Sequence, residues 1–85
     1  MSNIGMIMNI DEKVKETLKK LGMHIKELRE EQEISTTELA QKTGIRKEYL
    51  EKIEDGRAYG VRMEKHLLKI SKGLGIKFYQ LFDFE

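Results

Sequence analysis

Apolar residues recur at helical intervals along most of the chain, and glycines or capping residues separate the stretches. In the first long stretch the intervals are four, three, four and three, at Val14, Leu18, Leu21, Ile25 and Leu28. This spacing places one apolar stripe along an α-helix, and Asp11 and Glu12 favour a helix N-terminus at its start. Gly22 lowers helix propensity and predicts a break between an N-terminal arm and the first core helix.

The pattern of residues 1–10 is different, because the segment is low in charge and rich in Met and Ile. Its apolar residues alternate, at Ile4, Met6, Met8 and Ile10. Alternation of this kind permits a strand. A loose N-terminal segment, a strand and a contact with a second subunit are all compatible with this pattern.

The next helix is marked by local signals at both ends. Ser35 and Glu38 form the S-x-x-E capping box, in which each side chain bonds a free backbone N–H group at the other's position. The helix predicted over residues 36–42 ends at Gly44, because glycine readily adopts the left-handed conformation of a helix C-terminus.

Three further helical segments follow. A short helix over about residues 46–55 ends at Gly56, and a longer one ends at Gly75. The apolar face of the longer helix consists of Met63, Leu67, Ile70 and Leu74. A last helical turn closes the core with Ile76, Phe78, Leu81 and Phe82. The predicted fold class is therefore all-α.

Composition limits the classes of function. A chain of 85 residues is one domain, and the absence of cysteine excludes disulfides and thiolate metal sites. We expect no cofactor and no metal, and no enzyme, because a chain this short has little room for a catalytic pocket. His24 and His66 have no metal-ligand spacing. No apolar stretch is long enough for a transmembrane helix or typical of a signal peptide, so we expect a cytoplasmic protein and no membrane partner.

The net charge of +1 indicates no partner by itself, but the charge is unevenly distributed. Residues 11–55 hold ten Lys or Arg and twelve Asp or Glu, a net of −2, whereas residues 57–77 hold six and one, a net of +5. A basic excess is the usual electrostatic basis of nucleic-acid binding. The net positive charge is therefore concentrated in the second half of the chain.

Residues 36–55, TTELAQKTGIRKEYLEKIED, are typical of a helix-turn-helix, two short helices joined by a turn that contains glycine. With the flanking stretches LGMHIKELREEQEIS and HLLKISKGLGIKFYQLF, residues 21–82 resemble the XRE/Cro-type helix-turn-helix family of bacterial and phage transcriptional regulators. The resemblance implies a compact five-helix lambda-repressor-like domain over residues 21–85. Residues 1–20 form an N-terminal extension, a loose segment followed by a helical arm.

The family resemblance also implies roles for individual residues. In such proteins the second helix of the motif lies in the DNA major groove and presents its N-terminal residues to the bases. The corresponding base-reading residues are Arg46, Lys47, Glu48, Glu51 and Lys52. The residues expected to bind phosphate are Thr36, Thr37, Arg57 and Arg62. Arg29 and Glu54 match a pair that resembles an internal salt bridge.

Several positions depart from the family pattern. Thr36 is shorter than the glutamine that many relatives have there, and Arg46 occupies a capping position although it cannot accept an N–H bond. The loop after Gly56 is about two residues longer than the common form. The recognition helix and its ends are nearly neutral, with four basic and four acidic residues between residues 46 and 57.

The function expected from these features is sequence-specific DNA binding by a transcriptional regulator. It would act as a repressor that occupies a promoter as a homodimer on a pseudo-palindromic operator. Tyr79 and Phe84, in the apolar C-terminal run, are the candidates for an exposed dimer interface. The alternative is a protein-interaction module, antitoxin-like or an accessory subunit, that uses a helix-turn-helix scaffold to bind a protein partner.

Overall fold

Four α-helices and one 3-10 helix make up the computed structural model, which describes residues 2–60 and 62–84, with side chains from residue 12 onward. The elements in chain order are α1 (Ser2–Glu31), α2 (Thr36–Thr43), α3 (Lys47–Glu54), α4 (Met63–Leu74) and η1 (Phe78–Phe82). The predicted all-α, five-helix fold is confirmed. Within the described residues, no helix combines the length and hydropathy needed to cross a membrane.

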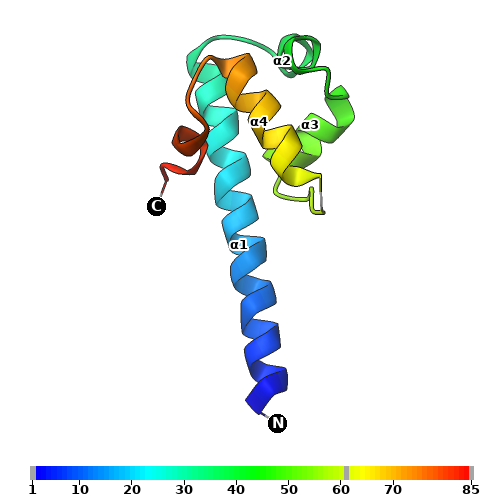
Figure 1. Ribbon diagram of the computed structural model, residues 1–85, viewed down its shortest axis with the longest axis vertical. Coiled ribbons are helices and arrows are strands. Elements are labelled where there is room, and N and C mark those ends of the chain that lie inside the picture. Colours follow the sequence, from blue (N-terminus) through cyan, green and yellow to red (C-terminus); the bar gives the residue numbers. More distant parts are fainter. Residues whose placement is uncertain (1, 61, 85) are drawn as a thin grey trace.

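Helix α1 is the longest element, and its N-terminal part projects away from the other helices (Figure 1). The molecule is consequently elongated, with principal extents of 48 × 24 × 17 Å. The helix begins at Ser2, not at Asp11, so residues 2–10 are helical and the strand alternative is wrong. Adding a residue to an existing helix fixes little new backbone for each hydrogen bond gained, which favours continuation over a separate strand. The other alternative, a contact of residues 1–10 with a second subunit, depends on side chains that lie outside the described ones, so it stays a prediction.

Gly22 does not interrupt α1, contrary to the prediction from its low helix propensity. It lies where α1 passes directly against the C-terminal end of α3. A Cβ atom at this position would lie 2.3 Å from the carbonyl oxygen of Ile53 and 2.5 Å from that of Glu54. Glycine is therefore required for the close approach of two backbones, and this requirement outweighs the loss of about 1 kcal/mol in helix propensity.

The core lies between the C-terminal half of α1 and the four shorter elements. Its buried apolar side chains are Leu21, Ile25, Leu39, Ile45, Leu50, Ile53, Ala58, Leu67, Ile70, Leu74 and Leu81. The predicted apolar stripe of α1 is thus divided, because Leu21 and Ile25 are buried whereas Val14 and Leu18 are only half-buried. These last two lie on the part of α1 that extends beyond the core.

The C-terminal turn closes the core as predicted. Leu81 of η1 is completely buried, and Phe78 packs against the core. The ring of His24 on α1 holds this turn in place, since its Nε2 atom donates to the carbonyl oxygen of Gln80 at 3.0 Å. His24 therefore has a packing role.

Candidate nucleic-acid interface

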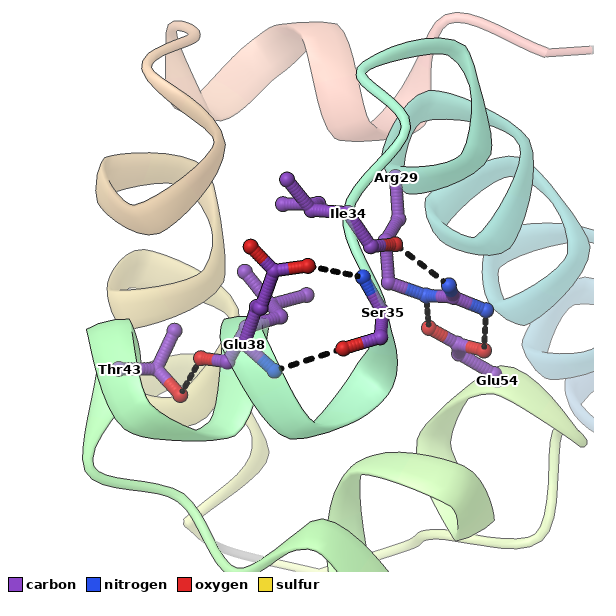
Figure 2. Close-up of polar contacts among 7 residues, drawn as sticks. Arg29, Ile34, Ser35, Glu38, Thr43 and Glu54 are labelled. Carbon is purple, nitrogen blue, oxygen red and sulfur yellow. Dashed lines mark hydrogen bonds and ion pairs between the residues drawn. The ribbon is translucent and has the colours of Figure 1, made fainter.

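The start of α2 has a complete capping box, shown in Figure 2. The backbone N–H of Glu38 donates to Oγ of Ser35 at 3.1 Å, and the N–H of Ser35 donates to Oε1 of Glu38 at 3.1 Å. Two of the four free N–H groups at this helix end are thereby satisfied. The other two belong to Thr36 and Thr37, the residues predicted to bind phosphate, and neither has a backbone partner within α2. Their amides and hydroxyls are available to an anion at this helix N-terminus.

The turn between α2 and α3 is held by Thr43, a residue that sequence reasoning did not single out. Its buried hydroxyl donates to the carbonyl oxygen of Leu39 at 2.8 Å and accepts from the N–H of Ile45 at 3.2 Å. Gly44 takes a φ of +74° and its N–H donates to Ala40 O at 2.8 Å. These bonds fix the angle at which α3 leaves the turn.

The recognition helix α3 begins without a side-chain cap. Arg46 occupies the N-cap position, with φ −62° and ψ 140°, and no side chain there bonds a helix N–H. Its carbonyl accepts the N–H of Leu50 at 2.9 Å, the first bond of the helix. The predicted absence of a cap is confirmed, and the first N–H groups of α3 point outward beside a cationic side chain.

Four of the five predicted base-reading residues share the outer face of α3. Lys47, Glu48, Glu51 and Lys52 are exposed, whereas Leu50, Ile53 and Glu54 are buried on the opposite face. Positions 47, 48, 51 and 52 fall on one side of a helix with 3.6 residues per turn. The arrangement presents two cations and two carboxylates to any partner that lies along this face. The role of each residue in reading bases stays a prediction.

Glu54 is removed from this face by a buried ion pair with Arg29, also drawn in Figure 2. Arg29 donates from Nε to Oε2 of Glu54 at 2.7 Å and from Nη2 to Oε1 at 3.0 Å. Its Nη1 donates to the carbonyl oxygen of Ile34 at 2.8 Å. The hydrogen bond to Glu54 raises the pKa of Arg29. The structural role expected for this pair is confirmed, and one of the four acidic groups is turned away from the outer surface.

A second acidic group is partly neutralised by the loop that follows α3. Nη2 of Arg57 lies 3.1 Å from Oδ2 of Asp55, with both side chains exposed. An exposed pair of this kind contributes little to stability and is easily exchanged for another partner. Arg57 therefore remains able to contact a phosphate.

Arg46 directly precedes the first turn of α3 and is exposed, as the other four candidates are. It lines an open groove of about 480 Å³ together with Tyr49, Arg62 and His66. This groove joins the starts of α3 and α4, and Arg62 is the uncapped N-cap residue of α4. The structure thus brings Arg46 together with Arg62, a predicted phosphate-binding residue.

The floor of this groove contains a half-buried imidazole. The ring centroids of His66 and Tyr49 are 4.7 Å apart, and Nδ1 of His66 is buried without a hydrogen-bond partner among the described residues. Burial, with a smaller contribution from the nearby charge of Lys69, lowers the pKa of His66. Burial thus disfavours the charged form of the imidazole, and His66 adds little to the positive charge of the groove.

The two predicted dimer-interface residues differ in exposure. Tyr79 is 67% exposed, as expected. Phe84 is half-buried, and its ring packs on His24 with a centroid distance of 5.9 Å, so the expectation of a free side chain is wrong. Phe82, assigned to the core from its position in the apolar run, is instead 42% exposed. The exposed aromatic residues of this end are therefore Tyr79 and Phe82.

Comparison with known proteins relates residues 24–85 to the family model of the Cro/C1-type helix-turn-helix DNA-binding domain. Among solved structures, the chain is similar to the restriction-modification controller protein C.AhdI from Aeromonas hydrophila, with 29% sequence identity and a TM-score of 0.72. The match covers 76% of this chain and 96% of that chain. No curated protein matches the chain.

Proposed function

Because the chain belongs to the Cro/C1-type helix-turn-helix family, we propose that it represses transcription by occupying a promoter as a homodimer. DNA binding and transcriptional regulation follow from the family itself. Repression, the dimer and the individual contacts are the proposal. Occupancy alone is sufficient for repression, because a protein bound across a promoter excludes polymerase.

The observation that carries the proposal is the arrangement of two helix starts around one outer face. Thr36 and Thr37 present free N–H groups at the start of α2, and Lys47 is exposed at the uncapped start of α3. Amides and hydroxyls at a helix start suit a phosphate, and lysine suits the O6 and N7 acceptors of guanine. Glu51, on the same face as Lys47, is able to accept from the amino group of cytosine.

A homodimer would double this surface. Helix-turn-helix dimers bind half-sites about 34 Å apart, one helical turn of DNA, and the operator then mirrors the two-fold symmetry of the protein. The exposed aromatic side chains Tyr79 and Phe82 are the part of the described surface best suited to the subunit contact.

Selection from a random duplex pool, followed by titration of the selected duplex across a salt series, tests the proposal. We expect an enriched palindrome and an affinity that falls steeply with salt, because each neutralised phosphate adds about 0.9 to the slope. Lys47→Ala should relax the base preference at one position of each half-site. Arg57→Ala should weaken binding to all duplexes alike and lower the slope by about 1.

Lys77→Ala is the matched control, because Lys77 is an exposed cation that precedes η1 and lies outside the helix-turn-helix. If all three substitutions change DNA affinity equally, the assigned surface is wrong. If no duplex is enriched by a folded protein, the DNA-binding proposal fails.

A second candidate function is a protein-interaction module, favoured by the charge of the outer face of α3. Together with Asp55, the face has three carboxylates and two lysines, which is unfavourable next to a phosphate backbone. A protein partner would raise the midpoint of thermal unfolding further as its concentration increases, whereas duplex DNA would leave the midpoint unchanged.

The structural match favours one class of target for the repressor. C.AhdI is a restriction-modification controller protein. Of the phage, restriction-modification and toxin–antitoxin settings compatible with a small repressor, we favour control of restriction-modification genes. A reporter with the promoters of neighbouring genes, in the presence and absence of this protein, distinguishes the three.

A further inference from the structure

A groove lies outside the helix-turn-helix, between α1 and the loop that follows α3. It has a volume of about 560 Å³, and its floor contains the half-buried side chains of Val14 and Leu18. The backbones are in close contact below it, since a Cβ atom on Gly56 would lie 2.7 Å from Cα of Lys19. This contact fixes the direction of the arm, the part of α1 before residue 21, relative to the recognition helix.

The rim of the groove is positively charged. Lys15, Lys19 and Arg57 line it together with the exposed ring of Tyr59, and the described lining includes no carboxylate. Neither lysine forms an ion pair with another side chain that the structure describes, whereas Lys20 pairs with Glu16 at 3.6 Å. Two unpaired lysines, and an arginine whose one ion pair with Asp55 is exposed and easily exchanged, are suited to an anionic partner.

Arg57 connects this groove to the candidate DNA interface. It also lines a polar hollow of about 390 Å³ that contains Lys26 of α1 and Thr36 of α2. Three carboxylates also line that hollow: Glu54 and Asp55 are paired with arginines, and Glu51 is exposed on the outer face of α3. Arg57 thus lies between the phosphate-binding candidates of the helix-turn-helix and the lysines of the arm.

The lysines follow a regular spacing along α1. Lys15, Lys19 and Lys26 are four and seven residues apart, so they share one face of the helix. At about 1.5 Å per residue, they extend over roughly 16 Å. The phosphates of one DNA strand advance by about 3.4 Å along the helix axis per nucleotide, so a row of this length is long enough to reach more than one phosphate.

We propose that the arm binds the DNA that flanks each half-site, with Lys15 and Lys19 on phosphates and Tyr59 against the sugar–phosphate backbone. The inference rests on the proposed function and adds a contact outside residues 24–85, the part that matches the family model. The apolar floor of Val14 and Leu18 would also suit a protein, but the two unpaired lysines on the rim favour a polyanion. The arm thus raises affinity without reading bases.

Two double variants with the same change in net charge test this contact. Lys15→Gln with Lys19→Gln removes the cations of the rim. Lys13→Gln with Lys20→Gln removes cations from the other side of the arm, where Lys13 lines a separate hollow with Thr17. Each protein is titrated with the selected duplex in two forms, one with a full helical turn of flanking DNA on each side and one trimmed to the selected bases.

We expect the Lys15/Lys19 variant to lose affinity for the flanked duplex by about tenfold or more at low salt, with a salt slope lower by about 2. On the trimmed duplex it should bind like the wild type. The Lys13/Lys20 variant should bind both duplexes like the wild type. Circular dichroism at each protein's working concentration verifies that the helix content is unchanged.

Equal losses in the two variants would overturn the inference, because net charge alone would explain them. Unchanged DNA affinity, with a dimer that dissociates in the Lys15/Lys19 variant, would identify the groove as a protein contact and also overturn it. Wild-type protein that binds no duplex would refute the proposed function as well. Wild-type binding without any effect of Lys15 and Lys19 would refute only the role of the arm.

Discussion

Helices α2 and α3 are each eight residues long and pack against one another, yet they begin in different ways. The start of α2 is stabilised locally by the reciprocal bonds of Ser35 and Glu38. The start of α3 has no cap, because Arg46 occupies the capping position. One helix is therefore defined by its own sequence, and the other depends on the rest of the fold.

The difference teaches how a recognition helix keeps its end free. Helix α3 is anchored at its C-terminal half, where Leu50 and Ile53 are buried and Glu54 is bound by Arg29. Since these tertiary contacts hold the helix, its first N–H groups need no internal acceptor. A helix start of this kind is open to an external anion.

The largest effect is expected from removing the internal anchor of α3. Glu54→Leu leaves the buried guanidinium of Arg29 without its carboxylate and should lower the free energy of unfolding by about 3–5 kcal/mol. Small domains have a total stability of about 5–15 kcal/mol, so this is a large fraction. Urea denaturation of the variant measures the loss.

Two controls make this result specific to the ion pair. Glu51→Leu changes an exposed carboxylate of the same helix and should alter stability by less than about 0.5 kcal/mol. Combining Glu54→Leu with Arg29→Met removes the unpaired charge and should recover part of the loss. Equal effects of the two glutamate substitutions would show that α3 is not anchored through Glu54.

A second way to break the anchor is to separate α1 from α3. Gly22→Ala places a methyl group 2.3 Å from the carbonyl oxygen of Ile53, and backbone atoms cannot move aside as a side chain can. We expect a loss of about 1–3 kcal/mol from overpacking, although alanine is the better helix former. Gly73→Ala, which meets the side chain of Thr43 at 2.8 Å, should destabilise less in the same denaturation experiment.

The capping box of α2 and the glycine at position 22 show how much of the fold could be predicted from the sequence. The capping box of Ser35, the glycine stops and the buried positions of the helices follow from local chemistry and from the spacing of apolar residues. The role of Gly22 does not, because its requirement comes from α3, about 30 residues further along the chain. The structure of residues 1–10 could not be predicted for a related reason. Their alternating apolar pattern gives no sign of the helix that residues 2–10 form ahead of the core.

The candidate site, too, could be predicted only in part from the sequence. The helix-turn-helix motif predicted which residues of α3 are exposed, because its periodicity separates an outer from an inner face. It did not predict that Arg46 joins Arg62, or that Lys15 and Lys19 join Arg57. Those neighbourhoods depend on how α1, α4 and the loop after α3 meet in space, and no interval along the chain encodes them.

Exchanging the two types of helix start should have an intermediate effect. Ser35→Ala removes the cap of α2 and should destabilise the protein by about 1 kcal/mol. Arg46→Ser supplies α3 with the cap it lacks and should stabilise it by a similar or smaller amount. The same substitution should weaken DNA binding, because a cation is lost and a free N–H becomes occupied. Thermal unfolding and duplex titration of both variants measure the two effects, and an Arg46→Ser protein that binds DNA as well as the wild type would contradict an open helix start.

The smallest effect concerns the contact between Tyr49 of α3 and His66 of α4. Because burial lowers the pKa of His66, the unfolded chain binds a proton there more readily than the folded protein does. Stability should therefore fall as the pH drops below the unfolded value of about 6.5. His66→Phe keeps a ring against Tyr49 but does not titrate, so its unfolding midpoint should fall less than that of the wild type between neutral and mildly acidic pH. Parallel pH profiles of the two proteins would mean that the imidazole binds protons equally well in the folded and the unfolded protein. The contact between Tyr49 and His66 would then make no pH-dependent contribution to the anchoring of α3.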